Sequence, residues 1–476
     1  MARRRFAAAL DTLCIVAGLT AALALRAPAH NVVLNAAPIG NTDVVGMDSR
    51  LGRAFILDDG VLAQQVTLSP RGGWDWTGSN SSNTLHVLDT RSGRTIKAIN
   101  VPTTVHSMVV DAATNRVFAF DQGQLQVIDA RDGALLNPVT ISAGSDELND
   151  YIDTALVDER TGHLFATLDQ QNYGAPSGQH LLLLDGRTGA TLHDLTFPPR
   201  PASVTHTSNG GTSIIYGTAL SLALDSQAGR LYVFNADRRM SVVDTGSGRI
   251  LSTRRLPVVL TDAQVDGQSG RIFAFVMSSG PTTRLGAGRW QAPVRTLDML
   301  DPRTGAIHTL ASVTGFSDIA VDENDNRVFI PDIARRAVIV LDGASGRILR
   351  TVALGLQPFQ IVLDEPRHRA LVTLAAGYNA TTADTHIAML DTRSGALLRA
   401  ISTGHPLNNV TIDTGTGHLV TTYDTMGSGQ PDDRYGWMPS WLRAHLPWIP
   451  APPPPPPALN ANQRIITHTA LTLDPS

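Results

Sequence analysis

Polar side chains recur at one place in this sequence, four or five residues ahead of a series of regularly spaced aspartates. Four of these places hold Asp, and the six candidates that we single out are Asp43, His106, Asp153, Asp262, Asp318 and Asn409. Converging carboxylate and amide oxygens could hold a hard cation such as Ca²⁺. Together with His106 they could instead transfer protons as general acids and bases. The alternative is that these positions are polar because they line a water-filled channel.

The tryptophans form a second candidate set. All six lie in insertions between repeated segments: Trp74, Trp76, Trp290, Trp437, Trp441 and Trp448. Tryptophans that served only a core would stand mostly in the repeated strands. Because half-exposed Trp is enriched at recognition surfaces, we expect these residues to stack on sugars or on apolar groups of a partner. The alternative is that each insertion packs on its own tryptophan.

Two short patterns alternate along the chain and must position these residues. One places an Asp inside an apolar run and restarts the run after a tight turn, as in residues 109–120 (VVDAATNRVFAF). The other reads apolar-Asp-x-x-Ser/Thr-Gly-x-apolar, as in residues 388–398 (AMLDTRSGALL). The apolar runs are typical of strands, while Asp starts each turn and Gly supplies the positive φ that closes it. Two such hairpins make four antiparallel strands per unit.

The repeat is long enough for a propeller blade. The first pattern has its Asp at 48, 111, 158, 225, 266, 322, 364 and 413, and the shortest spacings are 41 and 42 residues. This period fits four-stranded blades and predicts an all-β propeller with eight of them; seven is the alternative. The eighth unit, ending near Asp474, lacks its last strand. Residues 31–35 (NVVLN) could supply it, which would close the ring by pairing the two ends of the chain.

These units resemble the YVTN family of β-propeller repeats and, more loosely, the quinoprotein-dehydrogenase-like propellers, over about residues 40–425. The resemblance implies an exported or surface protein and supplies no chemistry. Eight-bladed quinone dehydrogenases of this kind carry Trp after their Asp-x-x-Thr-Gly turns, where this chain has residues such as Ala98, Thr253 and Arg350. With a single cysteine there is no Cys-x-x-Cys-His haem attachment. We therefore expect neither haem nor quinone as a cofactor, and a divalent cation such as calcium stays open.

The insertions all fall in the connections between the second and third strands of a blade, or between blades. They cover about residues 69–83, 172–179, 198–216, 278–293, 377–385 and 424–463, the last with six consecutive prolines, Pro452–Pro457. In a blade these connections lie at one end of the strands and the Asp–Gly turns at the other. One face of the disc therefore carries all the inserted segments, and binding sites usually lie on such loops.

The first 29 residues have the three-part organisation of a secretory signal peptide. Arg3, Arg4 and Arg5 precede an apolar run, and Ala27-Pro28-Ala29 offers a small-x-small cleavage pattern. The alternative is an uncleaved anchor in the inner membrane, since the apolar stretch nearly reaches the ~20 residues of a span. We expect residues 31–476 to be a single propeller domain, exported to the periplasm or secreted.

Composition narrows the function. The net charge of −4 argues against a nucleic-acid surface, and the single cysteine excludes a disulfide framework. The sequence favours a monomeric binding or scaffold protein that recognises a protein, a glycan or an envelope component through its tryptophan-bearing loops. The alternative is a metal-dependent hydrolase of the lactonase type, with the polar residues at the mouth of the central channel as its site.

Overall fold

The computed structural model describes the repeated units and some segments of the insertions. It covers residues 32–39, 45–58, 63–68, 74–77, 83–101, 105, 107–120, 124–136, 138–141, 150–170, 177–200, 202–206, 212–216, 220–276, 284–285, 289–290, 294–314, 318–375, 386–403, 407, 409–426 and 463–474. The predicted leader at 1–29 and the residues Asp43, His106, Trp437, Trp441 and Trp448 lie outside these ranges. In the described residues no helix is long and apolar enough to cross a membrane.

Apolar runs form strands, and each repeated unit folds into one antiparallel sheet of four strands in chain order. The first sheet consists of β2 (Val45–Asp48), β3 (Arg53–Asp58), β6 (Asn83–Asp89) and β7 (Thr95–Val101). The second sheet consists of β8 (Ser107–Asp111), β9 (Arg116–Phe120), β10 (Gln124–Asp129) and β11 (Val139–Thr140), and the third of β12 (Asp150–Asp158), β13 (His163–Gln170), β14 (Ser177–Asp185) and β15 (Thr191–Arg200). The fourth consists of β18 (Ser221–Asp225), β19 (Arg230–Phe234), β20 (Arg239–Asp244) and β21 (Ile250–Arg255), and the fifth of β22 (Leu260–Asp266), β23 (Arg271–Val276), β26 (Val294–Leu300) and β27 (Ile307–Thr314). The sixth consists of β28 (Ala320–Asp322), β29 (Arg327–Asp332), β30 (Ala337–Asp342) and β31 (Ile348–Ala353), and the seventh of β32 (Gln357–Asp364), β33 (Arg369–Ala375), β34 (His386–Asp391) and β35 (Leu397–Ser402).

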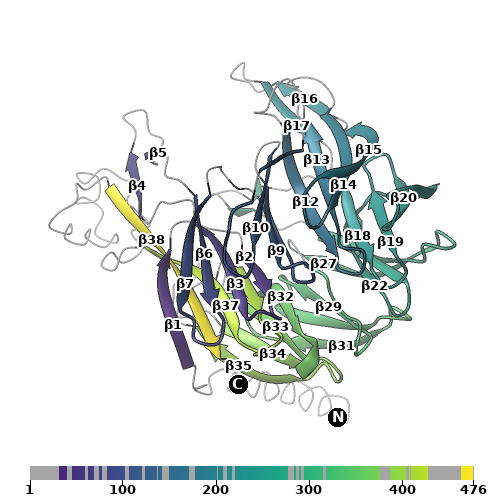
Figure 1. Ribbon diagram of the computed structural model, residues 1–476. Helices are drawn as coiled ribbons and strands as arrows, with labels where there is room; N and C mark the ends of the chain where they lie inside the picture. Colours follow the sequence, from purple (N-terminus) through teal and green to yellow (C-terminus); the bar gives the residue numbers. More distant parts are fainter. Residues whose placement is uncertain are drawn as a thin grey trace, which may run out of the picture.

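The eighth sheet joins the two ends of the chain. It contains β36 (Asn409–Ile412), β37 (Leu419–Met426) and β38 (Gln463–Asp474), and β1 (Val32–Ile39) pairs with β38 from Val32–Asp474 to Ile39–His468. Figure 1 shows β1 in purple beside β38 in yellow. The prediction that the start of the chain supplies the missing strand is confirmed, with the strand extending to Ile39.

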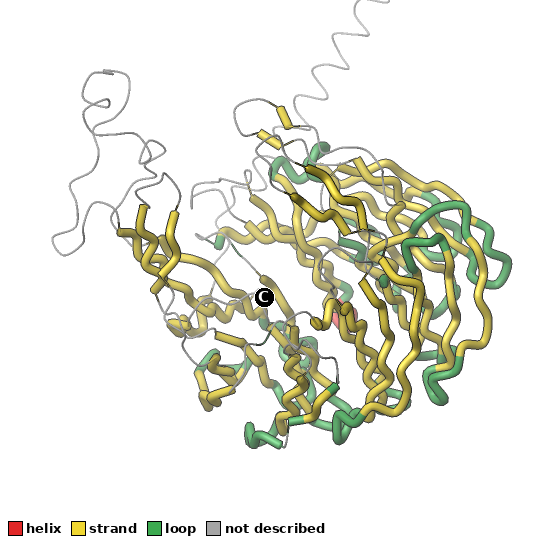
Figure 2. The backbone as a smooth tube through the Cα atoms, turned by 90° about the horizontal axis from the view of Figure 1, so that it is seen from above, coloured by secondary structure: helices red, strands yellow, loops and turns green. Residues whose placement is uncertain are grey.

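The hydrophobic core lies between the sheets. Each of the eight buried apolar clusters joins two neighbouring sheets, and the closing cluster packs Ala54, Ile56 and Leu88 of the first sheet against Val420 of the eighth. The first strand of every sheet contacts the first strand of the next, and β36 contacts β2. The sheets therefore form a closed ring, seen from above in Figure 2. The fold is an eight-bladed β-propeller, and the blades are numbered here in the order of these sheets.

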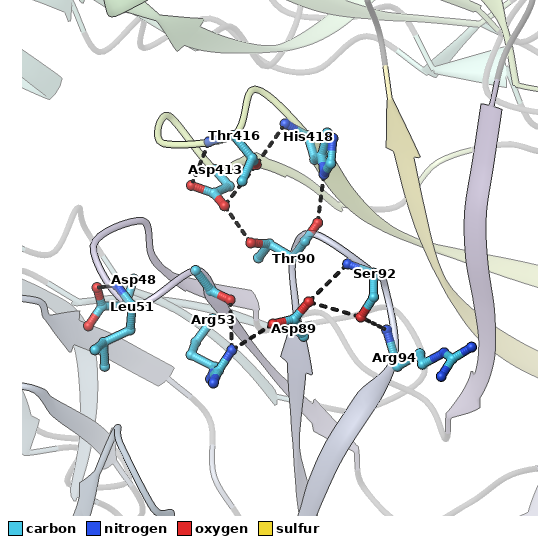
Figure 3. A network of polar contacts seen from close by, with 11 residues as sticks. Asp48, Leu51, Arg53, Asp89, Thr90, Ser92, Arg94, Asp413, Thr416 and His418 are labelled. Atoms are coloured by element: carbon cyan, nitrogen blue, oxygen red, sulfur yellow. Dashed lines mark hydrogen bonds and ion pairs between the residues drawn. The ribbon is translucent and has the colours of Figure 1, made fainter.

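One face of the disc carries the Asp–Gly turns, and we call it the short-turn face. The eight aspartates of the first sequence pattern, which we call the leading aspartates, are all buried on this face. Each has a structural role in its turn: Asp111, for example, accepts hydrogen bonds from Ala113 N at 2.8 Å and Thr114 Oγ1 at 2.6 Å. The turns also interlock. At the junction of blades 8 and 1, Thr90 Oγ1 donates to Asp413 and His418 Nδ1 lies 2.7 Å from Thr90 O (Figure 3). These contacts account for the aspartates, as their place in the sequence pattern predicts, and they give His418 a structural role.

The opposite face carries the insertions, and we call it the insertion-bearing face. Three hairpins decorate it: β4 (Ala63–Leu68) with β5 (Trp74–Thr77), β16 (Ala202–His206) with β17 (Thr212–Tyr216), and β24 (Arg284–Leu285) with β25 (Arg289–Trp290). Figure 1 shows β5, β16 and β17 in the upper part of the view. The first hairpin leaves blade 1 and pairs through β4 with Gln463–Thr467 of β38, so it bridges blades 1 and 8.

Candidate functional site

The predicted residues fall at the insertion-bearing ends of strands. Asp153 and Asn409 lie in the inner strands β12 and β36, and Asp262 lies in β22, while Asp318 comes two residues before β28. Trp74 and Trp76 stand on β5 opposite Leu68 and Val66, and Trp290 stands on β25 opposite Arg284. The structure describes the side-chain surroundings of Asp262 and Asp318, and these two belong to neighbouring blades 5 and 6.

A belt of hydrogen bonds links the inner strands at this end. Inner strands of adjacent blades share no ladder, so a side chain from one blade meets a backbone N–H of the next. Ser221 Oγ accepts from Ala263 N at 3.3 Å, and Gln360 both accepts from Val410 N and donates to Val410 O at 3.1 Å. Asp318 likewise accepts from the backbone N–H of Ile361. Polarity at these positions thus has a structural use that sequence reasoning missed.

Blade 5 supports the bulge of its inner strand in a different way, since the Ala263 N–H at this bulge donates to Ser221 Oγ of blade 4. Blades 3 and 7 carry similar bulges, and each is filled by a threonine of the second strand: Thr167 Oγ1 accepts from Thr154 N, and Thr373 Oγ1 from Gln360 N, both at 3.0 Å. Ala274 stands at the matching place in blade 5 and offers no hydroxyl. There Asp262 adopts a left-handed backbone with φ of 50°. Asp enters this region more readily than most non-glycine residues but at some cost in free energy, and backbone strain of this kind concentrates at functional sites.

Asp262 uses this conformation to meet Arg295, the second residue of β26. The Arg295 Nη2 donates to the Asp262 carboxylate and, at 2.6 Å, to Thr261 Oγ1. The guanidinium also lies 4.4 Å from the centroid of the buried Phe275 ring. Its side chain is 17% exposed, whereas that of Asp262 is 55% exposed. We call Arg295, Thr261, Phe275 and Asp262 the Arg295 site: a fixed guanidinium fork holding a solvent-facing carboxylate.

A second carboxyl lies behind the first. Asp318 Oδ1 accepts from Ile319 N at 2.9 Å, and its burial raises its pKa, with the negative charge of Asp262 adding to the effect. A carboxyl with a raised pKa near a second carboxylate is suited to acid–base chemistry, whereas an arginine side chain suits the recognition of carboxylates. Among the described residues, no group of three or more His, Cys, Asp or Glu side chains is placed to hold a metal ion.

The comparisons with known proteins bear on the fold. No family model matches the sequence, and no curated protein matches it. Sqt1 of Saccharomyces cerevisiae is similar in structure, with a TM-score of 0.51 and 9% identity over 82% of this chain and 94% of Sqt1. The dihydro-heme d1 dehydrogenase NirN gives a TM-score of 0.49 with 12% identity over 77% of this chain and 69% of NirN, and BamB of Moraxella catarrhalis gives 0.44 with 15% identity over 83% and 95%.

Sqt1 is a β-propeller, and together with the repeated four-stranded sheets of this chain it confirms the prediction of a propeller. At 9% identity the likeness to Sqt1 establishes the architecture alone. What the chain binds must therefore be argued from its own surface.

Proposed function

We propose that this chain is an exported propeller scaffold that binds a protein partner with its insertion-bearing face. The observation that supports this most is the contrast between the two faces. On the short-turn face the turns bond to one another, as Arg160 does when its Nη2 donates to Thr245 Oγ1 of the next blade at 2.9 Å. The insertion-bearing face instead carries the added hairpins and an exposed carboxylate on a strained backbone.

The rigidity of the ring supports a binding role. Eight apolar clusters and the two sets of side-chain bonds between blades hold the strand ends in fixed positions. Loops on such a scaffold can recognise a partner with little loss of conformational entropy. Export rests on the sequence of residues 1–29, and the partner would then be a component of the cell envelope.

The test replaces the tryptophans of the described hairpins. In the triple variant Trp74→Ala, Trp76→Ala and Trp290→Ala, we expect loss of partner retention in a pull-down from envelope extract. The melting temperature should change little, because β5 and β25 lie outside the four-stranded blades. The matched control removes exposed apolar side chains of the outer strands, Ile96→Ala, Leu251→Ala and Leu398→Ala, and should retain the partner.

Unchanged retention by the tryptophan variant would contradict the proposal. Retention that survives protease treatment of the extract and is competed by soluble sugars would assign the face to a glycan instead. The acid pair Asp262 and Asp318 supports a second candidate, a hydrolase active at the channel mouth. That candidate requires Asp318→Asn to abolish turnover of a lactone or ester that the wild-type protein hydrolyses.

A further inference from the structure

The Arg295 site already holds a carboxylate, and that carboxylate belongs to the chain itself. The Phe275 ring and the Thr261 hydroxyl fix the guanidinium from two sides, so little conformational freedom is lost when it binds an anion. Asp262, by contrast, is more than half exposed and sits on a left-handed backbone. The Arg295 guanidinium is therefore rigid, whereas the Asp262 side chain that it now binds is strained and accessible.

Further arginines flank this site at the same end of the disc. Blades 4 and 6 have no insertion between their second and third strands, and their short connections carry exposed arginines at matching places. Together with the last residue of β21 they form what we call the arginine arc: Arg238, Arg239, Arg255, Arg335 and Arg336. Blade 5, with the Arg295 site, lies between the two blades.

Two arginines of the arc occupy backbone positions that usually favour glycine. Arg238 has φ of 64° and Arg336 has φ of 50°. Each donates from Nη1 to a carbonyl beyond the outer strand of its own blade, Pro257 O at 3.4 Å and Gly355 O at 3.1 Å. Both acceptors are neutral, and no carboxylate in the part of the chain that the structure describes forms an ion pair with either guanidinium group.

Carboxylates compensate only part of the arc. Asp237 binds Arg239 at 3.0 Å, and the buried Asp332 binds Arg335 at 2.5 Å. Arg238 and Arg336 bond to carbonyls, and the side chain of Arg255 is exposed. The described surface of blades 4 to 6 on this face is thus positive, although the whole chain has a net charge of −4.

We propose that the Arg295 site and the arginine arc bind an acidic segment of a protein partner, with a partner carboxylate displacing Asp262 from Arg295. This inference rests on the proposed function and names the chemistry of the partner. Planar guanidinium groups can bind carboxylates through paired hydrogen bonds, and Arg295 already binds the Asp262 carboxylate through Nη2. Thr261 and Phe275 are positioning residues that orient Arg295 for the incoming carboxylate.

The test measures the binding of a fluorescent peptide of alternating Glu and Gly residues to the full chain. We expect binding that weakens as salt rises and about a tenfold loss of affinity in Arg295→Gln, since one charge-assisted contact is removed. Asp262→Asn should tighten binding severalfold, because asparagine tolerates a left-handed backbone and removes the competing charge. Arg187→Gln, at an exposed arginine of the short-turn face, is the matched control and should leave the affinity unchanged.

Opposite effects of Asp262→Asn and Arg295→Gln distinguish this inference from a general electrostatic attraction. Unchanged affinity in both variants, with melting temperatures showing folded protein, would overturn it. So would equal binding of a peptide with Gln in place of Glu, or binding of vesicles rich in phosphatidylglycerol in preference to the peptide. If the tryptophan variant loses its partner while the peptide results are negative, the proposed function stands and this inference alone fails.

Discussion

Arg295 lies over Phe275 at 4.4 Å and binds the carboxylate of Asp262, a residue of the inner strand of the same blade. Ala274 stands where Thr167 and Thr373 support the bulges of blades 3 and 7, and the bulge of blade 5 instead bonds to Ser221 of blade 4 and to Arg295. At this bulge an inner-strand residue faces solvent with a charge, since the Asp262 side chain is 55% exposed. The relationship makes several properties of the chain measurable.

Backbone strain at Asp262 can be isolated by comparing two variants. Asp262→Ala and Asp262→Gly both lose the ion pair with Arg295, and only glycine is at ease with φ of 50°. We expect the glycine variant to be more stable than the alanine variant by about 1 kcal/mol in urea unfolding. Equal stabilities would show that the left-handed conformation is not retained in solution.

The belt between inner strands should contribute to stability through Gln360. Gln360→Leu leaves the buried N–H and C=O of Val410 without their partner, and we expect a loss of about 1–3 kcal/mol. Gln264→Leu makes the same change at an exposed position of another inner strand and should cost little. If both variants unfold at the same urea concentration, the belt contributes nothing measurable.

Turn glycines test the packing between blades. Gly162 and Gly189 have nearly the same φ, 71° and 75°, but a Cβ at Gly162 would have no neighbour within 4 Å, whereas at Gly189 it would lie 2.8 Å from Leu125 Cδ2 of the preceding blade. Gly162→Ala should therefore cost about 1 kcal/mol from backbone strain alone. Gly189→Ala should cost clearly more, because it also forces blades 2 and 3 apart. Thermal unfolding of the two variants provides the comparison, and equal costs would contradict the interlocked arrangement.

The pH dependence of stability should carry the signature of Asp298. Burial raises the pKa of this carboxyl, which is 3% exposed and whose Oδ1 has no hydrogen-bond partner among the described residues. Above the ordinary value of 3.8, the folded chain holds a proton that the unfolded chain has released, so stability falls as pH rises through this window. The turn carboxylates act at lower pH and with opposite sign: hydrogen bonds from Ser394 lower the pKa of Asp391, and its contribution is lost as pH falls.

Asp298→Asn isolates this effect. The variant should lose less stability than the wild-type chain as pH rises above 3.8, as measured by urea unfolding at several pH values. Parallel curves for the two proteins would mean that Asp298 titrates normally in the folded state.

Much of the fold follows from local sequence signals. An aspartate such as Asp111 starts every short turn, and a glycine such as Gly189 closes most of them, while Asn115, Asn326 and His368 take the left-handed position in three turns. Pairing of the chain ends was also predictable, since the eighth unit is one strand short. The joining of β4 to β38 could not be predicted, because its pairing depends on the meeting of two segments far apart in the chain.

The site was only half predictable. Asp262 and Asp318 stand out by their position in the repeat. Arg295 lies near the start of the third strand of its blade, where no sequence pattern singles it out. The role of Arg295 depends on the bulge opposite Ala274, and the sequence pattern does not reveal such a feature of main-chain geometry. The uses of Ser221 and Gln360 were equally hidden, because a polar residue beside a channel and one bonded to the next blade look alike in sequence.

The most direct test of the binding face is a cross-linking comparison of two exposed alanines. Ala334 lies in the short connection of blade 6 on the insertion-bearing face, and Ala134 lies in a turn of blade 2 on the short-turn face. With a photo-reactive benzophenone residue at either place, illumination in intact cells should cross-link a specific protein through position 334 and none through position 134. Cross-linking through position 134 alone would contradict the assignment of the insertion-bearing face as the binding surface.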